Sequence, residues 1–238
     1  QNSGDETTTI EPTETEVDLF IPYPTGNIIE INSCNELIQK IDSNLLGVFV
    51  LKNDIDCSDV TNFSPFLTFY GKLDGNKYTI SNLNIVKPIN TTNYRVENYV
   101  GVFTRIENAL IQRVNFVNVN ITQNTDSNFV GLVSGQTKNS TFFRVSAQGS
   151  INAKQYVGGI TGYLSLSNLW NSSSNIILNG TKYVGGVSGY SKDSNVRDSY
   201  SMGNNNGLDV VGGLIGGLDT SKVSSSYSTN EVISNSGY

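Results

Sequence analysis

The second half of the chain carries an internal repeat, and this repeat constrains the fold more than any other feature. A Val-Gly step, preceded in most copies by an aromatic residue, returns at spacings of 30, 27, 27 and 27 residues. Self-similarity at a fixed period of about 20–50 residues is the mark of a solenoid or a similar array. The valines of the step are Val100, Val130, Val157, Val184 and Val211, and the aromatic residues are Tyr99, Phe129, Tyr156 and Tyr183.

The local pattern within one period indicates strands. Apolar runs of three to six residues, rich in Val, Ile, Tyr and Phe, alternate with Gly, Asn, Ser and Asp. No apolar pattern at helical spacing is long enough to build a helical repeat. About 27 residues suit one coil of a β-helix, in which short strands are joined by bends and successive coils pair in parallel about 4.8 Å apart. The sequence therefore predicts an all-β solenoid.

In such a solenoid, equivalent residues stack. We expect the aromatic residues to form one ladder, the valines a second, and Tyr200 with Tyr227 a short third. The period favours a core position for the ring ladder, although solvent-facing rings would form a platform for a sugar. Trp170 is the only tryptophan of the chain. The paired glycines after the valines are expected where the chain turns a corner, with positive φ or with close approach of two backbones.

The charge of the chain is concentrated at its N-terminus. The net charge is −6, and residues 1–27 hold six acidic residues and no Lys or Arg, so that the rest of the chain is neutral. This Thr- and Glu-rich segment is typical of a solvated, partly disordered linker. A neutral body without a basic stripe argues against nucleic acid and anionic membranes as partners. No apolar stretch approaches the roughly 18 residues of a membrane span.

Residues 28–97 are expected to hold a cap and atypical first coils. Ser33 and Glu36 fit a capping box at the start of a short helix over 33–41. The apolar face of this helix would cover the raw N-terminal end of the solenoid, where open strand edges favour aggregation. Five repeats then fill residues 98–238, and another copy of the repeat would be due near Tyr238, so we expect the array to continue.

A longer motif carries a resemblance to a known family. Residues 71–85 read Gly-x-Leu-Asp-Gly-Asn-x-Tyr-Thr-Ile-x-Asn-Leu-x-Ile, and Tyr-Val-Gly-Gly-hydrophobic-x-Gly repeats follow. Over about residues 28–238 the chain resembles bacterial surface proteins with GLUG-motif repeats. That family includes large adhesins and the non-catalytic N-terminal regions of IgA-specific metallo-endopeptidases. The resemblance implies a right-handed parallel β-helix of the pectate-lyase-like type. The repeats at Gly101 and Gly131 depart from the motif because they lack its second glycine.

The residue types present exclude several kinds of chemistry. The chain has no His, which excludes Ser-His-Asp and Cys-His catalysis and His-ligated zinc within it. Cys34 and Cys57 are its only cysteines, and no Cys-x-x-Cys or nearby His would activate a thiol. We expect a structural disulfide between the helix and the end of the first coil, with two buried free thiols as the alternative. A disulfide would fit an extracellular location.

One group of acidic residues is a candidate site. Asp54 and Asp56 alternate with Ile55, which would put both carboxylates on one face, and Asp59 follows closely. Such a group could hold calcium or perform acid–base work on a glycan. The other interpretation, which we favour, is that these side chains accept hydrogen bonds from backbone N–H groups in turns.

Together these patterns predict a non-enzymatic rod or adhesive module of a secreted or cell-surface protein, without a cofactor. Its expected partner is a host surface protein or a glycan, and neighbouring coils or domains of the same chain are further candidates. Two alternatives stay open. One is an accessory, non-catalytic region of a secreted IgA-type metalloprotease. The other is a carbohydrate-active β-helix enzyme, a lyase or hydrolase, which would need clustered outward carboxylates on adjacent coils. Repeats specify the scaffold and leave the ligand unspecified.

Overall fold

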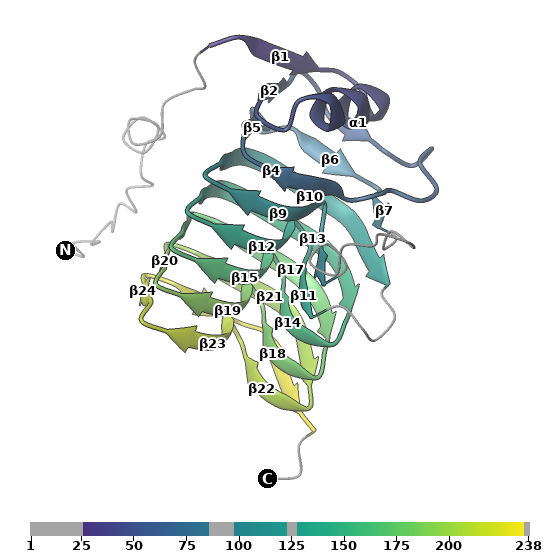
Figure 1. The fold of residues 1–238 in the computed structure, drawn as a ribbon. Helices are drawn as coiled ribbons and strands as arrows, with labels where there is room; N and C mark the ends of the chain where they lie inside the picture. Colours follow the sequence, from purple (N-terminus) through teal and green to yellow (C-terminus); the bar gives the residue numbers. More distant parts are fainter. Residues whose placement is uncertain (1–25, 86–97, 123–127, 236–238) are drawn as a thin grey trace, which may run out of the picture.

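The computed structural model describes residues 26–85, 98–122 and 128–235, and in them the chain winds into a parallel β-solenoid of about six coils (Figure 1). Strands pair in parallel from the first coil to the last. The prediction of an all-β solenoid with a period of about 27 residues is confirmed. The predicted linker over 1–27 lies almost entirely outside the described residues.

The strands stack into three sheets, which form the faces of the coils. The five-stranded sheet consists of β8 (Tyr99–Val100), β11 (Phe129–Gly131), β14 (Gln155–Gly158), β18 (Lys182–Gly185) and β22 (Asp209–Gly212). The six-stranded sheet consists of β4 (Phe66–Phe69), β9 (Phe103–Glu107), β12 (Ser134–Lys138), β15 (Thr161–Ser165), β19 (Ser188–Lys192) and β23 (Ile215–Asp219).

The third sheet has 15 strands and is called the wide sheet below. It begins with β1 (Ile28–Ile31), β2 (Val48–Leu51), β3 (Ile55–Asp56), β5 (Lys72–Asp74), β6 (Thr79–Ser81) and β7 (Asn84–Ile85). It continues with β10 (Leu110–Thr122), β13 (Thr141–Asn152), β16 (Asn168–Trp170), β17 (Ser173–Asn179), β20 (Asn195–Arg197), β21 (Tyr200–Gly207), β24 (Lys222–Ser224), β25 (Tyr227–Ser228) and β26 (Glu231–Ser234). One coil therefore passes from the five-stranded sheet through the six-stranded sheet into the wide sheet.

The register places equivalent residues beside one another. Val130 pairs with Val157, and Val157 pairs with Val184. All three are fully buried, so the valine ladder runs through the core. In the last described coil the core is open on one side: Val223 is 40% exposed, whereas its partner Val196 is 0% exposed. Burial of apolar side chains between stacked coils is thus the main stabilising contribution along the stack.

The helix α1 (Cys34–Ser43) covers the N-terminal end of the stack, as predicted (Figure 1). Ser33 accepts the N–H of Glu36 at 3.3 Å, which is one half of the expected capping box. The other half differs. The Glu36 carboxylate accepts the N–H of Asn32, one residue before the expected donor, at 2.9 Å, and also pairs with Lys40 Nζ at 3.0 Å. The Glu36 carboxylate therefore stabilises the start of α1 through its bonds to Asn32 and Lys40.

Buried serines satisfy the backbone at two corners of each coil. At the first corner, Ser167 Oγ accepts the N–H of Ser140 in the preceding coil at 3.1 Å and donates to the carbonyl of Ser165 at 2.6 Å. At the second corner, Ser172 Oγ accepts the N–H of Val145 at 3.1 Å and donates to the carbonyl of Trp170 at 2.8 Å. The same two bonds recur at Ser194, Ser221, Ser199 and Ser226. These ladders give buried corner amides the partners that they require.

A buried ion pair joins two early coils. Asp74 is fully buried and accepts hydrogen bonds from the guanidinium of Arg113, with Arg113 Nε at 3.0 Å. Gln112 Nε2 donates to the same carboxylate at 3.1 Å. Because removal of one partner would leave an uncompensated buried charge, this pair strongly favours the observed register between β5 and β10.

Replacement of one ladder serine tests the corner bonds. Ser172→Ala should lower the free energy of unfolding by about 1–3 kcal/mol, because the buried N–H of Val145 loses its acceptor. The matched control is Ser173→Ala, since the partly buried side chain of Ser173 makes no hydrogen bond to the described residues; its effect should stay within about 0.5 kcal/mol. Urea unfolding measures both variants, and equal losses would contradict a special role of the ladder.

The helix cap predicts a pH dependence. The hydrogen bonds from Lys40 and Asn32 lower the pKa of Glu36 from 4.5 to about 2. A group whose pKa is lower in the folded state stabilises the fold above its unfolded pKa and loses this contribution as the pH falls through its folded pKa. Glu36→Gln should therefore be less stable than the parent at pH 7, and the difference should shrink below pH 4.5 and vanish near pH 2. Thermal unfolding across this range measures it, and a constant difference would contradict the prediction.

Candidate functional site

Two of the three acidic residues of the candidate site, Asp54 and Asp56, accept hydrogen bonds within the fold. Asp54 Oδ1 accepts the N–H of Thr79 in the next coil at 2.8 Å. Asp56 accepts the side chain of Asn82 at 2.8 Å and the N–H of Ser58 at 3.0 Å, and these bonds lower the pKa of its carboxyl group. Asp59 adds no third ligand: within 26–85, 98–122 and 128–235, no three His, Cys, Asp or Glu side chains gather where they could hold a metal ion.

The two cysteines form a disulfide, so that prediction is confirmed. Cys34 lies in the first turn of α1 and Cys57 directly follows β3, and their Cα atoms are 5.2 Å apart. Both residues are buried. The bond therefore attaches the covering helix to the first coil of the solenoid.

The aromatic residues before the valines stack on the outside of the solenoid. The ring centroids are 4.9 Å apart from Tyr99 to Phe129, 4.7 Å from Phe129 to Tyr156 and 4.9 Å from Tyr156 to Tyr183, with nearly parallel planes. All four side chains are only partly buried, so the prediction that these rings belong to the core was wrong. At Tyr99 and Phe129 this follows from the strand, because successive residues of a strand point to opposite faces and the next valine is buried. At Tyr156 and Tyr183 the backbone itself is left-handed, with φ of 47° and 55°, and the ring still lies outside while the next valine is buried.

A second, shorter column of rings lies beside the first. Tyr163 and Tyr190 stack at 5.6 Å with planes only 4° apart. Their rings meet the first column edge to face, at 6.1 Å from Tyr163 to Tyr156 and 5.3 Å from Tyr190 to Tyr183. Such stacked and edge-to-face arrangements are the ones that aromatic rings prefer. The two columns form one surface, called the aromatic strip below, which consists of Tyr99, Phe129, Tyr156, Tyr183, Tyr163 and Tyr190.

Close contact between two sheets brings the columns together. An added Cβ at Gly189, in the six-stranded sheet, would lie 2.4 Å from the carbonyl carbon of Tyr156 in the five-stranded sheet. Only glycine permits that approach. Tyr190 follows it, which places the Tyr190 ring 5.9 Å from the Tyr156 ring. The sequence analysis missed this column, although Gly-Tyr recurs 27 residues apart at Gly162-Tyr163 and Gly189-Tyr190.

Cations cover the exposed faces at both ends of the first column. The guanidinium of Arg105 lies 5.1 Å from the ring centre of Tyr99, and the amine of Lys182 lies 5.1 Å from that of Tyr183. The Lys182 ammonium donates a hydrogen bond to the carboxylate of Asp209, which raises the pKa of Lys182. Burial raises the pKa of Tyr156 and Tyr163, so both phenols are neutral at pH 7 and can donate and accept hydrogen bonds. Since the ring faces of the first column are occupied, that column offers ring edges and flanking cations.

The β-solenoid does not itself show catalytic features, and the chain contains no His. Within the described ranges, no helix has the length and apolar character needed to cross a membrane.

No protein-family model matches this chain, and no curated protein matches its sequence. Its fold is similar to the crystal structure of a "putative immunoglobulin A1 protease" from Bacteroides ovatus, with a TM-score of 0.55 and 16% sequence identity. The similarity covers 85% of this chain and 66% of that one. At this identity the likeness shows the fold alone. The sequence resemblance to GLUG-motif proteins stays a prediction.

Reduction of the disulfide tests its contribution. The bond closes a loop with a sequence separation of 23 residues. In the chain-entropy model such a loop stabilises the fold by about 3 kcal/mol. Reductant should therefore lower the free energy of unfolding of the native chain by that amount and leave a Cys34→Ala/Cys57→Ala double variant unchanged. If reductant left the free energy of unfolding of the native chain unchanged, the predicted contribution of the disulfide would be wrong.

Proposed function

We propose that this chain is a non-enzymatic binding module of an extracellular protein, which holds a host surface protein or a glycan along the aromatic strip. The observation that carries this proposal is the partial exposure of six ordered rings in register over adjacent coils. Aromatic residues are enriched where proteins bind partners, because they offer a large contact area at low entropic cost.

The scaffold is suited to holding the rings of the aromatic strip in place for a ligand. Each coil contacts its neighbours through parallel strand pairs and a continuous buried core, so the stack behaves as a stiff, nearly one-dimensional array. The rings are consequently held at spacings of 4.7–4.9 Å before any ligand arrives. Such preorganisation reduces the entropic cost of binding.

The disulfide supports an extracellular location. Disulfides persist in oxidising compartments and are rare in the cytosol. The acidic, Thr- and Glu-rich composition of residues 1–27 is typical of a linker.

A second candidate is an accessory module of a secreted protease. The similarity in fold to the Bacteroides ovatus protein favours it, since that protein carries the description "putative immunoglobulin A1 protease" and is longer than the matched region. In this case the strip would contact immunoglobulin A1 or a glycan on it, and catalysis would reside outside this chain. The two candidates differ in partner and agree that this chain binds and does not catalyse.

Substitution within the strip tests the proposed function. Residues 1–238 are first screened against a glycan array and purified host surface proteins, with immunoglobulin A1 included to test the second candidate. Tyr190→Ser should then weaken binding of the hit at least tenfold, because it opens the second column and exposes the face of Tyr163; tenfold corresponds to about 1.4 kcal/mol.

The matched control is Tyr227→Ser, which removes one ring of the Tyr200–Tyr227 stack on the wide sheet. It should change the affinity less than threefold, and circular dichroism should show both variants folded. A chain without any saturable partner, or equal losses in the two variants, would overturn the proposed function.

A further inference from the structure

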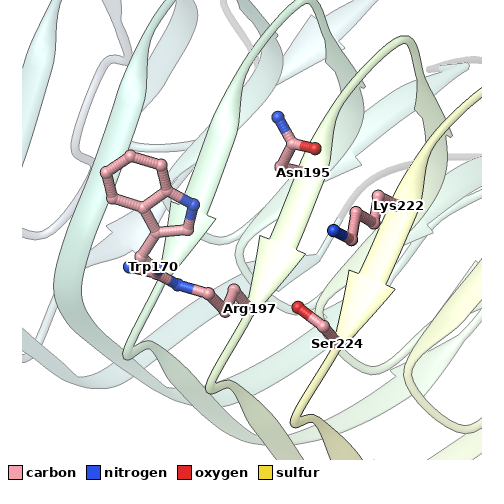
Figure 2. A pocket seen from close by; sticks show the side chains of 5 residues that line it. All are labelled: Trp170, Asn195, Arg197, Lys222 and Ser224. Carbon is pink, nitrogen blue, oxygen red and sulfur yellow. The ribbon is translucent and has the colours of Figure 1, made fainter.

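A polar hollow lies on the wide sheet, away from the aromatic strip. Its lining comes from three consecutive parallel strands, β16, β20 and β24, and its volume is about 180 Å³ (Figure 2). The strands are in register, so that Trp170 lies beside Arg197 and Arg197 beside Ser224. Asn195 pairs in the same way with Lys222. The floor of the hollow is therefore set by the strand ladder.

Arg197 makes two contacts at the side of the hollow that Trp170 forms. The guanidinium carbon of Arg197 lies 4.9 Å from the ring centre of Trp170, within the range of a cation–π contact. Arg197 Nε also pairs with the carboxylate of Asp198 at 3.1 Å. This carboxylate holds the guanidinium in place and balances its charge, so the uncompensated positive charge in the hollow belongs to Lys222.

Three polar groups of the hollow have no hydrogen-bond or ion-pair partner among the described residues. They are the indole N–H of Trp170, the hydroxyl of Ser224 and the amine of Lys222. Figure 2 shows the indole nitrogen and the Lys222 amine facing one another across the hollow. Lys182 and Lys192, by contrast, pair with Asp209 and Asp219.

The hollow also offers acceptors. Asn195 Nδ2 donates to the side-chain oxygen of Asn168 at 3.2 Å, which leaves the carbonyl oxygen of Asn195 free to accept a bond. The Ser224 hydroxyl can donate or accept. Donors, acceptors and the unpaired cation Lys222 thus surround a space of about 180 Å³, well below the roughly 300–1,000 Å³ of drug-sized sites. That space suits one small, highly oxygenated group.

We propose that this hollow binds a single acidic sugar unit, with its carboxylate at Lys222 and its hydroxyl groups at Trp170, Asn195 and Ser224. An acidic peptide side chain would use the amine and the indole N–H but would leave the acceptors of Asn195 and Ser224 without donors. A neutral sugar would leave the charge of Lys222 without a partner. An acidic sugar ring matches both features. The site is separate from the aromatic strip and would give the module a second binding site.

The single tryptophan gives a direct readout, since residues 1–238 have one indole N–H signal in a ¹H–¹⁵N spectrum. Glucuronate is titrated into the ¹⁵N-labelled chain, with glucose and glutamate as comparison ligands. We expect glucuronate to shift the indole signal saturably in the millimolar range, at least fivefold more tightly than either comparison ligand. Raising the salt concentration should weaken this binding.

Lys222→Ala should weaken glucuronate binding at least fivefold, and because this side chain is exposed the variant should fold normally. Lys192→Ala, on the six-stranded sheet, is the matched control and should bind like the parent. Glutamate binding as tight as glucuronate binding would assign the hollow to acidic peptides and overturn the proposal. A missing saturable shift, or an unaffected Lys222→Ala variant, would overturn it too. None of these outcomes bears on Tyr190→Ser, so the two proposals fail independently.

Discussion

Parallel pairing of equivalent residues in successive coils is the constraint on which the rest of this structure depends. A shift of one residue would turn the valines outward and the rings inward, because neighbouring positions of a strand face opposite sides. The observed register instead buries Val130, Val157 and Val184 and stacks the rings outside. The core, the aromatic strip and the floor of the polar hollow are consequences of this one alignment.

The corners of the coils require their own chemistry, because each turn breaks the strand ladder around a buried core. Serine hydroxyls complete the bonds of the corner amides, as at Ser167 and Ser172. Several corner residues adopt the left-handed backbone conformation, among them Asn139 at φ 46° and Asn171 at φ 48°. Asparagine tolerates this conformation better than most residues, but Leu166 adopts it as well, at φ 50°. The stack therefore imposes its corner geometry even where the local residue opposes it.

The sequence predicts the scaffold well because a repeat states which residues are equivalent. The period, the valine pairing, the covering helix and the bond between Cys34 and Cys57 follow from spacing and residue type alone.

The candidate site is harder to predict from the sequence, since the spacing of a ladder does not say whether its side chains face the core or the solvent. The rings were assigned to the core although the adjacent valines already filled it. Tyr190 was missed because its contact with Tyr156 depends on a close approach of two sheets at Gly189. The pairing of Asp74 with Arg113 was missed because it joins residues 39 positions apart.

Cross-linking of adjacent coils tests the register most directly. Ser165 and Lys192 are paired neighbours on β15 and β19, and the Cα separation of paired parallel strands, about 4.8 Å, falls within the range for a disulfide. Because Cys34 and Cys57 are already bonded, Ser165→Cys with Lys192→Cys would introduce the only free thiols. The account predicts rapid, nearly complete cross-linking of this pair on mild oxidation and little for Ser165→Cys with Asp219→Cys, two coils apart. Equal cross-linking of both pairs, or none in the first, would contradict the stack.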